Sequence, residues 1–420
     1  MLALRIAWRS FLRHRRRSLI TASAVSFGLG LMLASVGIAE DSHYRMIDMG
    51  VKLGSGHIVV QGKGYQRDQT LDYLVTKPDE VQKRIVGVPG IRQIAPRVRA
   101  SGLIRSGDTS SAVLVSGVDP TIEPLVSSIA DPKKRKKGDY IRPLAEMPNR
   151  NWPADIYIGS ELANTLHVGV GDKVVLTVSP KGGGRPESAA FMVRGIFRTG
   201  SDELDAMYVE IPIDEAQRLL KIGTSLTQLA IILEDNVTTL QTTAEIKRRL
   251  AGMTLETLPW QESMKELYDT IVIDDGGNYV MFAIIFAIVA IGIFNTMLMS
   301  VIERTREFGV MMAIGTNKFL MFRIVLAEAF VLALFAAAIG VTLGLGLHYW
   351  VSSVGIDIAK WAGEDYQVAG VVFDMKIYSR LTAYIVAKWS VVVGGLVLVS
   401  AIYPAYRATR LQPVEAMRHV

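Results

Sequence analysis

The chain has 420 residues, of which half are hydrophobic and a fifth are charged, with a formal net charge of +6 and no cysteine. The missing thiols exclude disulfides, thiol catalysis and cysteine-ligated zinc. The mean hydropathy of +0.29 is too low for a chain that lies mostly in lipid, so we expect a membrane bundle joined to a large soluble part.

The first 17 residues carry six arginines and no acidic residue. Leu4, Trp8, Phe11 and Leu12 recur at helical spacing, which is typical of a basic amphipathic helix on a membrane surface. An uncharged run at 18–39 follows and is long enough to cross a bilayer. Because arginines before such a run hold its start in the cytoplasm, we interpret 1–17 as a cytoplasmic helix and 18–39 as the first transmembrane helix. Nucleic-acid binding by the arginines and a cleaved signal peptide are the alternatives.

Residues 40–277 contain no further run that could span a membrane, and we expect them to form an extracytoplasmic α+β domain inserted between the first two transmembrane helices. The predicted division is one lobe at 48–118 plus 204–270, with a second lobe inserted at 119–203. Short apolar runs bounded by turn residues predict strands, and amphipathic stretches predict helices. The strands are Gly56–Gln61, Ser111–Val118, Lys173–Val178, Ala190–Arg198, Ala206–Pro212 and Leu226–Leu233, and the helices are Asp79–Val86, Ser160–Leu166, Asp214–Lys221 and Val237–Ala251.

Several motifs in this region lack the features of a ligand site. The basic run Lys133–Lys137 is interpreted as a solvated loop, and Lys181–Arg185 as a hairpin tip because it lacks the P-loop spacing. The acidic residues at 202, 203 and 205 are interpreted as a turn. The sequence contains no G-x-x-x-x-G-K-[ST], H-E-x-x-H or G-x-S-x-G motif, so we expect no catalytic residue, bound metal or cofactor on this chain.

The stretch from Tyr279 to Gly315 combines a spanning segment with a charged one. Residues 278–302 form the second predicted transmembrane helix, and the charges that follow must lie outside the lipid. On a helix, Phe308, Met311, Met312 and Gly315 form one apolar stripe, a shape that suits docking onto a partner. An amphipathic connector on the lipid surface is the alternative. The charges are Glu303, Arg304, Arg306 and Glu307.

Two further apolar runs complete the bundle, at 319–348 and 381–406. Arginines and lysines gather between the second and third spans and in the tail at 407–420, whereas 349–380 balances four acidic residues against three basic ones. The positive-inside rule then places both termini in the cytoplasm and 349–380 on the outer side.

Small and polar residues within the spans are candidates for helix packing or function. Gly30 with Ala34, and Gly340 with Gly344, are spaced for close helix contact. Glu328 is an acidic residue inside a span. It is either functional or a structural group that reaches water or Arg323. Asn295 is a weaker candidate, for a hydrogen bond between helices.

Four spans with one deep ionisable group make a poor solute channel but a plausible lever. A partner that presses on residues 303–315 could move the second and third helices as rigid rods and displace the external domain.

The residues at 295–315 resemble a known family. The stretch 295–315, NTMLMSVIERTREFGVMMAIG, is similar to the signature of the FtsX-like permease domain of ABC transporters, a family that includes lipoprotein-releasing permeases and macrolide exporters. Met312 departs from the basic residue that many relatives carry. The likeness extends over most of the chain, through Trp8–Ser18, Gly56–Gln61, Ile158–Ala163, Val168–Lys173, Val193–Gly200 and Pro404–Pro413.

The resemblance implies a permease of the bacterial inner membrane that pairs with a second permease, identical or homologous, and binds two ATPase subunits carrying ATP and magnesium. Residues 303–316 would be the cytoplasmic coupling helix. Glu303, Arg304, Arg306, Glu307, Phe308, Gly309, Met311, Met312 and Gly315 would carry the contact.

The leading hypothesis is extraction of lipoprotein, or another amphipathic substrate, for a periplasmic carrier. The alternatives are a macrolide-exporter-like pump that drives periplasmic solutes or peptides through an outer-membrane duct, a regulator of a periplasmic hydrolase, and a membrane-anchored enzyme.

Overall fold

The computed structural model describes residues 2–13, 15–54, 56–147, 152–357, 367–368, 371–372 and 376–410. It divides into two compact units. The helical unit comprises 1–44, 272–361 and 375–420, and the sheet unit comprises 45–271 and 362–374.

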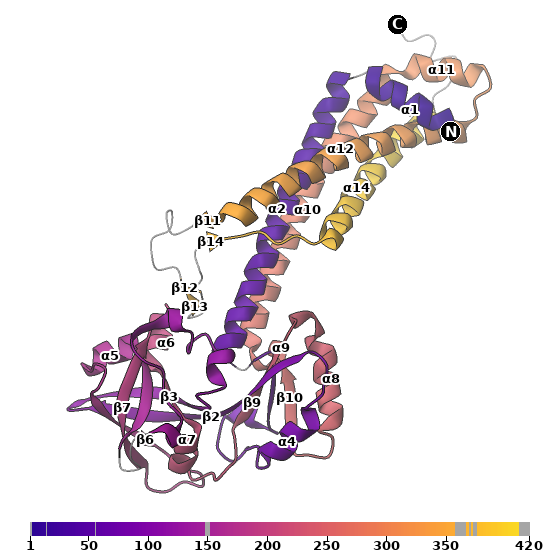
Figure 1. Ribbon diagram of the computed structural model, residues 1–420. Coiled ribbons are helices and arrows are strands. Elements are labelled where there is room, and N and C mark those ends of the chain that lie inside the picture. The colour runs from indigo at the N-terminus through magenta and orange to yellow at the C-terminus, as the bar shows by residue number, and fades with distance from the viewer. Residues whose placement is uncertain are drawn as a thin grey trace. The chain divides into compact units, whose positions relative to one another are not determined.

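Long helices form the helical unit, and within the described ranges four of them are long and apolar enough to cross a membrane: α2, α10, α12 and α14 (Figure 1). The short strands β11 and β14 pair with each other in antiparallel orientation. Residues 45–53 of α2 and 265–271 of α10 belong to the sheet unit. The elements are α1 Leu2–Arg13, α2 Arg15–Leu53, α10 Lys265–Glu303, α11 Thr305–Ala313, α12 Lys318–Val354, β11 Ile356–Asp357, β14 Lys376–Ile377 and α14 Ala383–Thr409.

Two helices are longer than the apolar runs that predicted them. α2 continues 14 residues beyond position 39, and α10 begins 13 residues before position 278. The helical unit therefore includes 40–44 and 272–277, which the sequence assigned to the external domain. Hydropathy reports where a helix can lie in lipid, and polar residues can continue the same helix beyond that point.

Helices α2 and α12 pack closely where their small residues meet. A methyl group added at Gly340 would lie 2.9 Å from the Ser26 carbonyl oxygen, and one at Gly344 would lie 2.8 Å from Leu33. At Gly30 it would lie 3.2 Å from Leu343, while Ala34 is half-buried. Ser26 Oγ also donates a hydrogen bond of 2.9 Å to the Ala336 carbonyl. Larger residues at these positions would push the two helices apart.

A ten-stranded sheet forms most of the described sheet unit, in the order β10-β1-β9-β2-β3-β8-β5-β7-β4, with β6 pairing to β2 and β7. One face carries the large apolar core of this unit, which includes Val60, Val98, Val115 and Leu229. The strands are β1 Ile58–Gly62, β2 Ile91–Ser106, β3 Thr109–Val118, β4 Arg135–Gly138, β5 Ala154–Gly159, β6 Lys173–Val178, β7 Glu187–Phe197, β8 Tyr208–Pro212, β9 Gln228–Leu233 and β10 Leu255–Pro259, with the separate pair β12 Gln367–Val368 and β13 Val371–Val372.

Helices flank this sheet, and several are single turns. The α-helices are α3 Tyr65–Asp68, α4 Pro78–Ile85, α5 Ser160–Leu166, α6 Asp202–Met207, α7 Ile213–Leu220, α8 Thr239–Arg249 and α9 Trp260–Ser263. The 3-10 turns are η1 Glu123–Leu125, η2 Pro132–Lys134, η3 Leu144–Glu146 and η4 Asn236–Thr238.

The sequence predicted many of these elements, and two of its interpretations were wrong. The strand at 173–178 and the helix at 160–166 are confirmed, as β6 and α5. The basic run at 133–137 is not a loop, because it forms η2 and the exposed edge strand β4. The acidic residues at 202–205 begin α6 rather than a turn, because the Ser201 hydroxyl accepts a hydrogen bond from the Leu204 amide.

The predicted division into two lobes cuts across strand pairing. β8 comes from the first predicted lobe and pairs with β5 of the second, and β6 of the second pairs with β2 of the first. Strands from both segments thus share one sheet, and the lobe boundaries stay a prediction.

Candidate coupling site

A short helix joins the ends of two long ones, as Figure 1 shows for α10, α11 and α12. α10 ends at Glu303 and α11 begins at Thr305, with Arg304 between them outside helical geometry. α11 ends in a paired cap in which Gly315 N donates to Met312 O and Thr316 N donates to Met311 O. Gly315 has a φ of +98°, which this cap requires and which glycine adopts without strain.

The start of α12 is fixed by a side chain. Asn317 Oδ1 accepts a hydrogen bond of 2.7 Å from the Leu320 amide, satisfying one of the free donors of the first turn. Both ends of the connection between α11 and α12 are therefore held by backbone and cap hydrogen bonds, which gives α11 a defined position at the end of α12.

A chain of ion pairs ties α11 to two other helices. Arg304 is 7% exposed, and its Nη1 lies 2.6 Å from Glu328 Oε1 of α12 while its Nε lies 3.0 Å from Glu307 Oε2. Glu307 Oε1 in turn lies 3.4 Å from Arg13 Nη1 of α1. The Arg304 guanidinium also lies 4.9 Å from the ring centroid of Phe308. Arg304 is thus the buried centre of this connection.

The apolar stripe of α11 faces its own bundle. Phe308 is 1% exposed and belongs to the core of the helical unit, and Met311 and Met312 pack against that core. The sequence predicted this stripe but assigned it to docking, because periodicity does not distinguish a face that packs within the chain from one that meets a partner. Gly309 is also buried, whereas Gly315 is exposed and shapes the turn.

The opposite face of α11 is exposed. Arg306, Val310 and Ile314 follow one another at intervals of four residues, and Ile314 is 79% exposed and Val310 46% exposed. Glu303, at the end of α10, is exposed as well. This surface, which we call the outer face of α11, is defined by Arg306, Val310 and Ile314. It mixes one cation with two apolar side chains, a composition that suits contact with another protein.

The two candidates inside the spans differ in their surroundings. Glu328 is half-buried and pairs with Arg304, a partner that the sequence did not suggest, while Arg323 lies 5.8 Å from the ring centroid of Phe319. Arg304 and Glu328 are 24 residues apart, so only the fold brings them together. Asn295 is exposed on α10.

Within the described residues, no group of three or more histidine or acidic side chains could hold a metal ion. Arg304 and the cap at Gly315 connect α11 to the ends of α10 and α12, so a displacement of α11 would be passed to both helices.

Two family models match consecutive parts of the chain. Residues 18–249 match the MacB-like periplasmic core domain, and residues 279–413 match the FtsX-like permease C-terminal domain. The first of these alone covers more than half of the chain.

Two curated relatives match over nearly their whole length, and a third matches over part of its length. The lipoprotein-releasing system transmembrane protein LolC of Xylella fastidiosa strain Temecula1 is 20% identical, over 97% of this chain and 97% of its own length. LolE of Haemophilus influenzae is 23% identical over 98% of each chain. The macrolide export ATP-binding/permease protein MacB of Shewanella sp. strain ANA-3 is 24% identical over 99% of this chain but only 60% of its own length. The chain belongs to the FtsX-like permeases of ABC transporters that carry a MacB-like periplasmic core domain.

Proposed function

We propose that this chain is a permease subunit of the lipoprotein-releasing type in a bacterial inner membrane. ATP hydrolysis on separate ATPase subunits, two per complex, moves its periplasmic domain, which extracts lipoprotein or another amphipathic substrate and passes it toward the outer membrane. A second permease, identical or homologous, and a periplasmic carrier complete the assembly.

The outer face of α11 is the observation that carries this proposal. It is an exposed, mixed apolar and cationic surface on a helix that is fixed to both neighbouring long helices by a buried ion pair and a cap. Arginines and lysines surround it, which favours the cytoplasmic side, where an ATPase would be found. We assign the ATPase contact to Arg306, Val310 and Ile314. Phe308, Met311 and Met312 position the helix from inside.

The exposed apolar surface of α10 supports a second permease or lipid as a neighbour. The apolar part of α10 is 17% buried and that of α14 is 22% buried, whereas those of α2 and α12 are each 44% buried. A spanning helix with so little cover within its own chain needs another helix or lipid beside it. We place the second permease against α10.

The substrate class rests on the relatives. LolC and LolE match this chain over nearly their whole length, and both are named as parts of a lipoprotein-releasing system. MacB matches nearly the whole of this chain, which supports macrolide-exporter-like efflux through a periplasmic adaptor as the second candidate. Co-purification separates them, because a lipoprotein carrier is expected with the first and an adaptor with an outer-membrane duct with the second.

Charge reversal combined with loss of apolar surface tests the docking assignment. We expect Arg306→Glu with Ile314→Asp to weaken ATPase co-purification about 10- to 100-fold, because burial of one large aliphatic side chain contributes about 1.5–3 kcal/mol. Substrate-stimulated ATP hydrolysis by the reconstituted complex should fall in parallel. The matched control is Tyr349→Asp, a side chain that is 76% exposed at the other end of α12. Normal co-purification and coupling in the double variant would contradict the assignment.

A further inference from the structure

One face of the sheet carries a row of polar side chains. Strand register places Glu256, Gln61, Gln228 and Arg97 side by side across β10, β1, β9 and β2. Two residues after Arg97, the side chain of Arg99 lies on the same face of β2. Polar residues in the middle of a sheet need partners, because a buried polar group without one costs stability.

A cavity of about 190 Å³ opens on this polar face. Its lining includes Gln61, Arg99 and Gln228 from the sheet and the rings of Tyr65 and Tyr208. Gln228 is 3% exposed, and both tyrosines are 7% exposed, so these walls are built into the fold. The rings and the nearby Leu114 give the cavity apolar surface as well as polar groups.

Three hydrogen-bond donors in the wall have no partner among the described residues, and one of them is the Ser263 hydroxyl. Gln228 Nε2 and Arg99 Nε are both buried, and neither makes a hydrogen bond to the residues that the structure describes. The other end of the Arg99 guanidinium is held, because its Nη2 donates a 3.0 Å hydrogen bond to the Gly54 carbonyl. The position of Arg99 is therefore fixed while its Nε is left for an acceptor that the described chain does not supply.

The charges around the cavity leave Arg99 without a counterion. Glu123 pairs with Arg97, at 2.5 Å from its Nη2, and Glu256 already accepts hydrogen bonds from Gly64 N, Gln66 N and Gln61 Nε2. Burial and the nearby Glu123 charge raise the pKa of Glu210 to about 8, so this carboxyl is mostly protonated at neutral pH. Among the described residues, no carboxylate forms an ion pair with Arg99.

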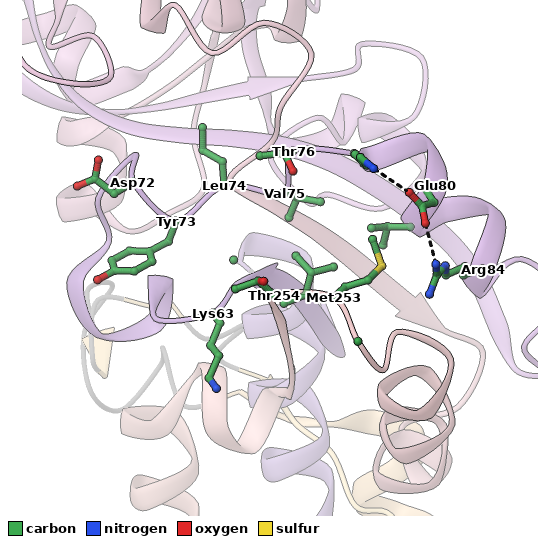
Figure 2. Close-up of a pocket in the computed structure, with 15 residues that line it drawn as sticks. Lys63, Asp72, Tyr73, Leu74, Val75, Thr76, Glu80, Arg84, Met253 and Thr254 are labelled. Atoms are coloured by element: carbon green, nitrogen blue, oxygen red, sulfur yellow. Dashed lines mark hydrogen bonds and ion pairs between the residues drawn. The ribbon is translucent and has the colours of Figure 1, made fainter.

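A second cavity in the sheet unit, of about 430 Å³, lacks these features. Figure 2 shows Glu80 joined to Arg84, 2.7 Å away, and Lys63 and Asp72 pointing away from the middle of the lining residues. The Lys77 ammonium lies 3.7 Å from Glu80 as well. The charges that face this cavity satisfy one another, so nothing there indicates a ligand.

We propose that the cavity lined by Arg99 and Gln228 binds a small organic carboxylate. Its two oxygens would accept from Arg99 Nε and Gln228 Nε2, and a short apolar chain would lie against Tyr65, Tyr208 and Leu114. Most of the lining is polar, and the wall formed by Tyr65, Tyr208 and Leu114 gives the short chain of an organic acid an apolar contact that an inorganic anion of the same charge would not use.

Propionate and propionamide test this on the full chain in lipid nanodiscs, with empty nanodiscs as background. The two probes have the same shape and differ in charge, so saturation-transfer NMR should give a propionate affinity at least tenfold higher than that for propionamide. Inorganic phosphate should not displace propionate at equal concentration. This comparison needs no variant and is independent of folding defects.

Variants then locate the site. Arg99→Gln and Gln228→Leu should each weaken propionate binding at least tenfold, whereas Arg105→Gln, at an exposed position on the same strand, should leave it unchanged. Equal binding of propionamide, absence of propionate binding, displacement by phosphate, or an equal loss in the Arg105 variant would each overturn the proposal.

Discussion

At the scale of single residues, buried charges in both units are held by partners distant in sequence. Arg304 meets Glu328 across 24 positions, and Arg97 meets Glu123 across 26. Sequence reasoning marked Arg304 and Glu328 as notable but could not pair them, because the pairing depends on how helices pack rather than on spacing along one helix. Buried charges of this kind are costly when their partner is lost.

We predict that Arg304→Met destabilises the helical unit by about 3–5 kcal/mol, because it leaves the Glu328 carboxylate, whose side chain is only 12% exposed, without a counterion. The double variant Arg304→Met with Glu328→Leu should recover most of this loss. The control Arg13→Met removes a pair whose arginine side chain is 75% exposed, and should cost about 1 kcal/mol or less. Thermal unfolding in nanodiscs measures all three. A double variant no more stable than the single one would contradict the buried pairing.

Glu210 predicts a pH dependence of stability. Burial raises its pKa from 4.5 to about 8, so between these values the folded chain keeps a proton that the unfolded chain has released. The free energy of unfolding should therefore fall as pH rises from 5 to 8. Glu210→Gln should flatten that slope, whereas Glu146→Gln, at an exposed position, should leave it unchanged. Urea denaturation at pH 5, 6, 7 and 8 measures the slope, and an unaltered slope in the Glu210 variant would be the contrary result.

At the scale of elements, α11 shows what the sequence could and could not predict. The charges at 303–307 and the glycine at 315 marked a short segment between two spans, and the structure has a helix there. The apolar stripe was also correct as a pattern, yet it packs inward at Phe308. The sequence did not predict strand β2, because the arginines at 92, 97, 99 and 105 hide its apolar pattern. Arg97 can lie in the interior because it forms an ion pair with Glu123.

Replacement by alanine should have opposite effects at the glycine that caps α11 and at a glycine inside α12. Gly315→Ala should destabilise the turn by about 1 kcal/mol, because alanine is strained at a φ of +98°. Gly346→Ala, on an exposed part of α12 with no atom near the added methyl group, should stabilise its helix by about 0.5–1 kcal/mol. Thermal midpoints that shift in the same direction for both variants would argue against the cap.

At the scale of the whole molecule, the four apolar helices were predictable from length and hydropathy, since the thickness of a bilayer fixes both. The extensions of α2 and α10 could not be predicted, because a polar helix and a polar loop have similar compositions. The pairing of β5 with β8 could not be predicted either, since residues far apart in sequence meet there. Family membership follows from matches spread over the whole chain, whereas the ATPase contact is our proposal and is argued from the outer face of α11.

Single-cysteine labelling tests most directly our proposal that α11 is cytoplasmic and the domain at 45–271 periplasmic. The sequence contains no cysteine, so Ile314→Cys on α11 and Lys136→Cys on β4 each give one exposed thiol without background. A membrane-impermeant maleimide should label the Lys136 variant in intact spheroplasts and the Ile314 variant only in inside-out vesicles. Labelling of both variants from the same side would contradict the account.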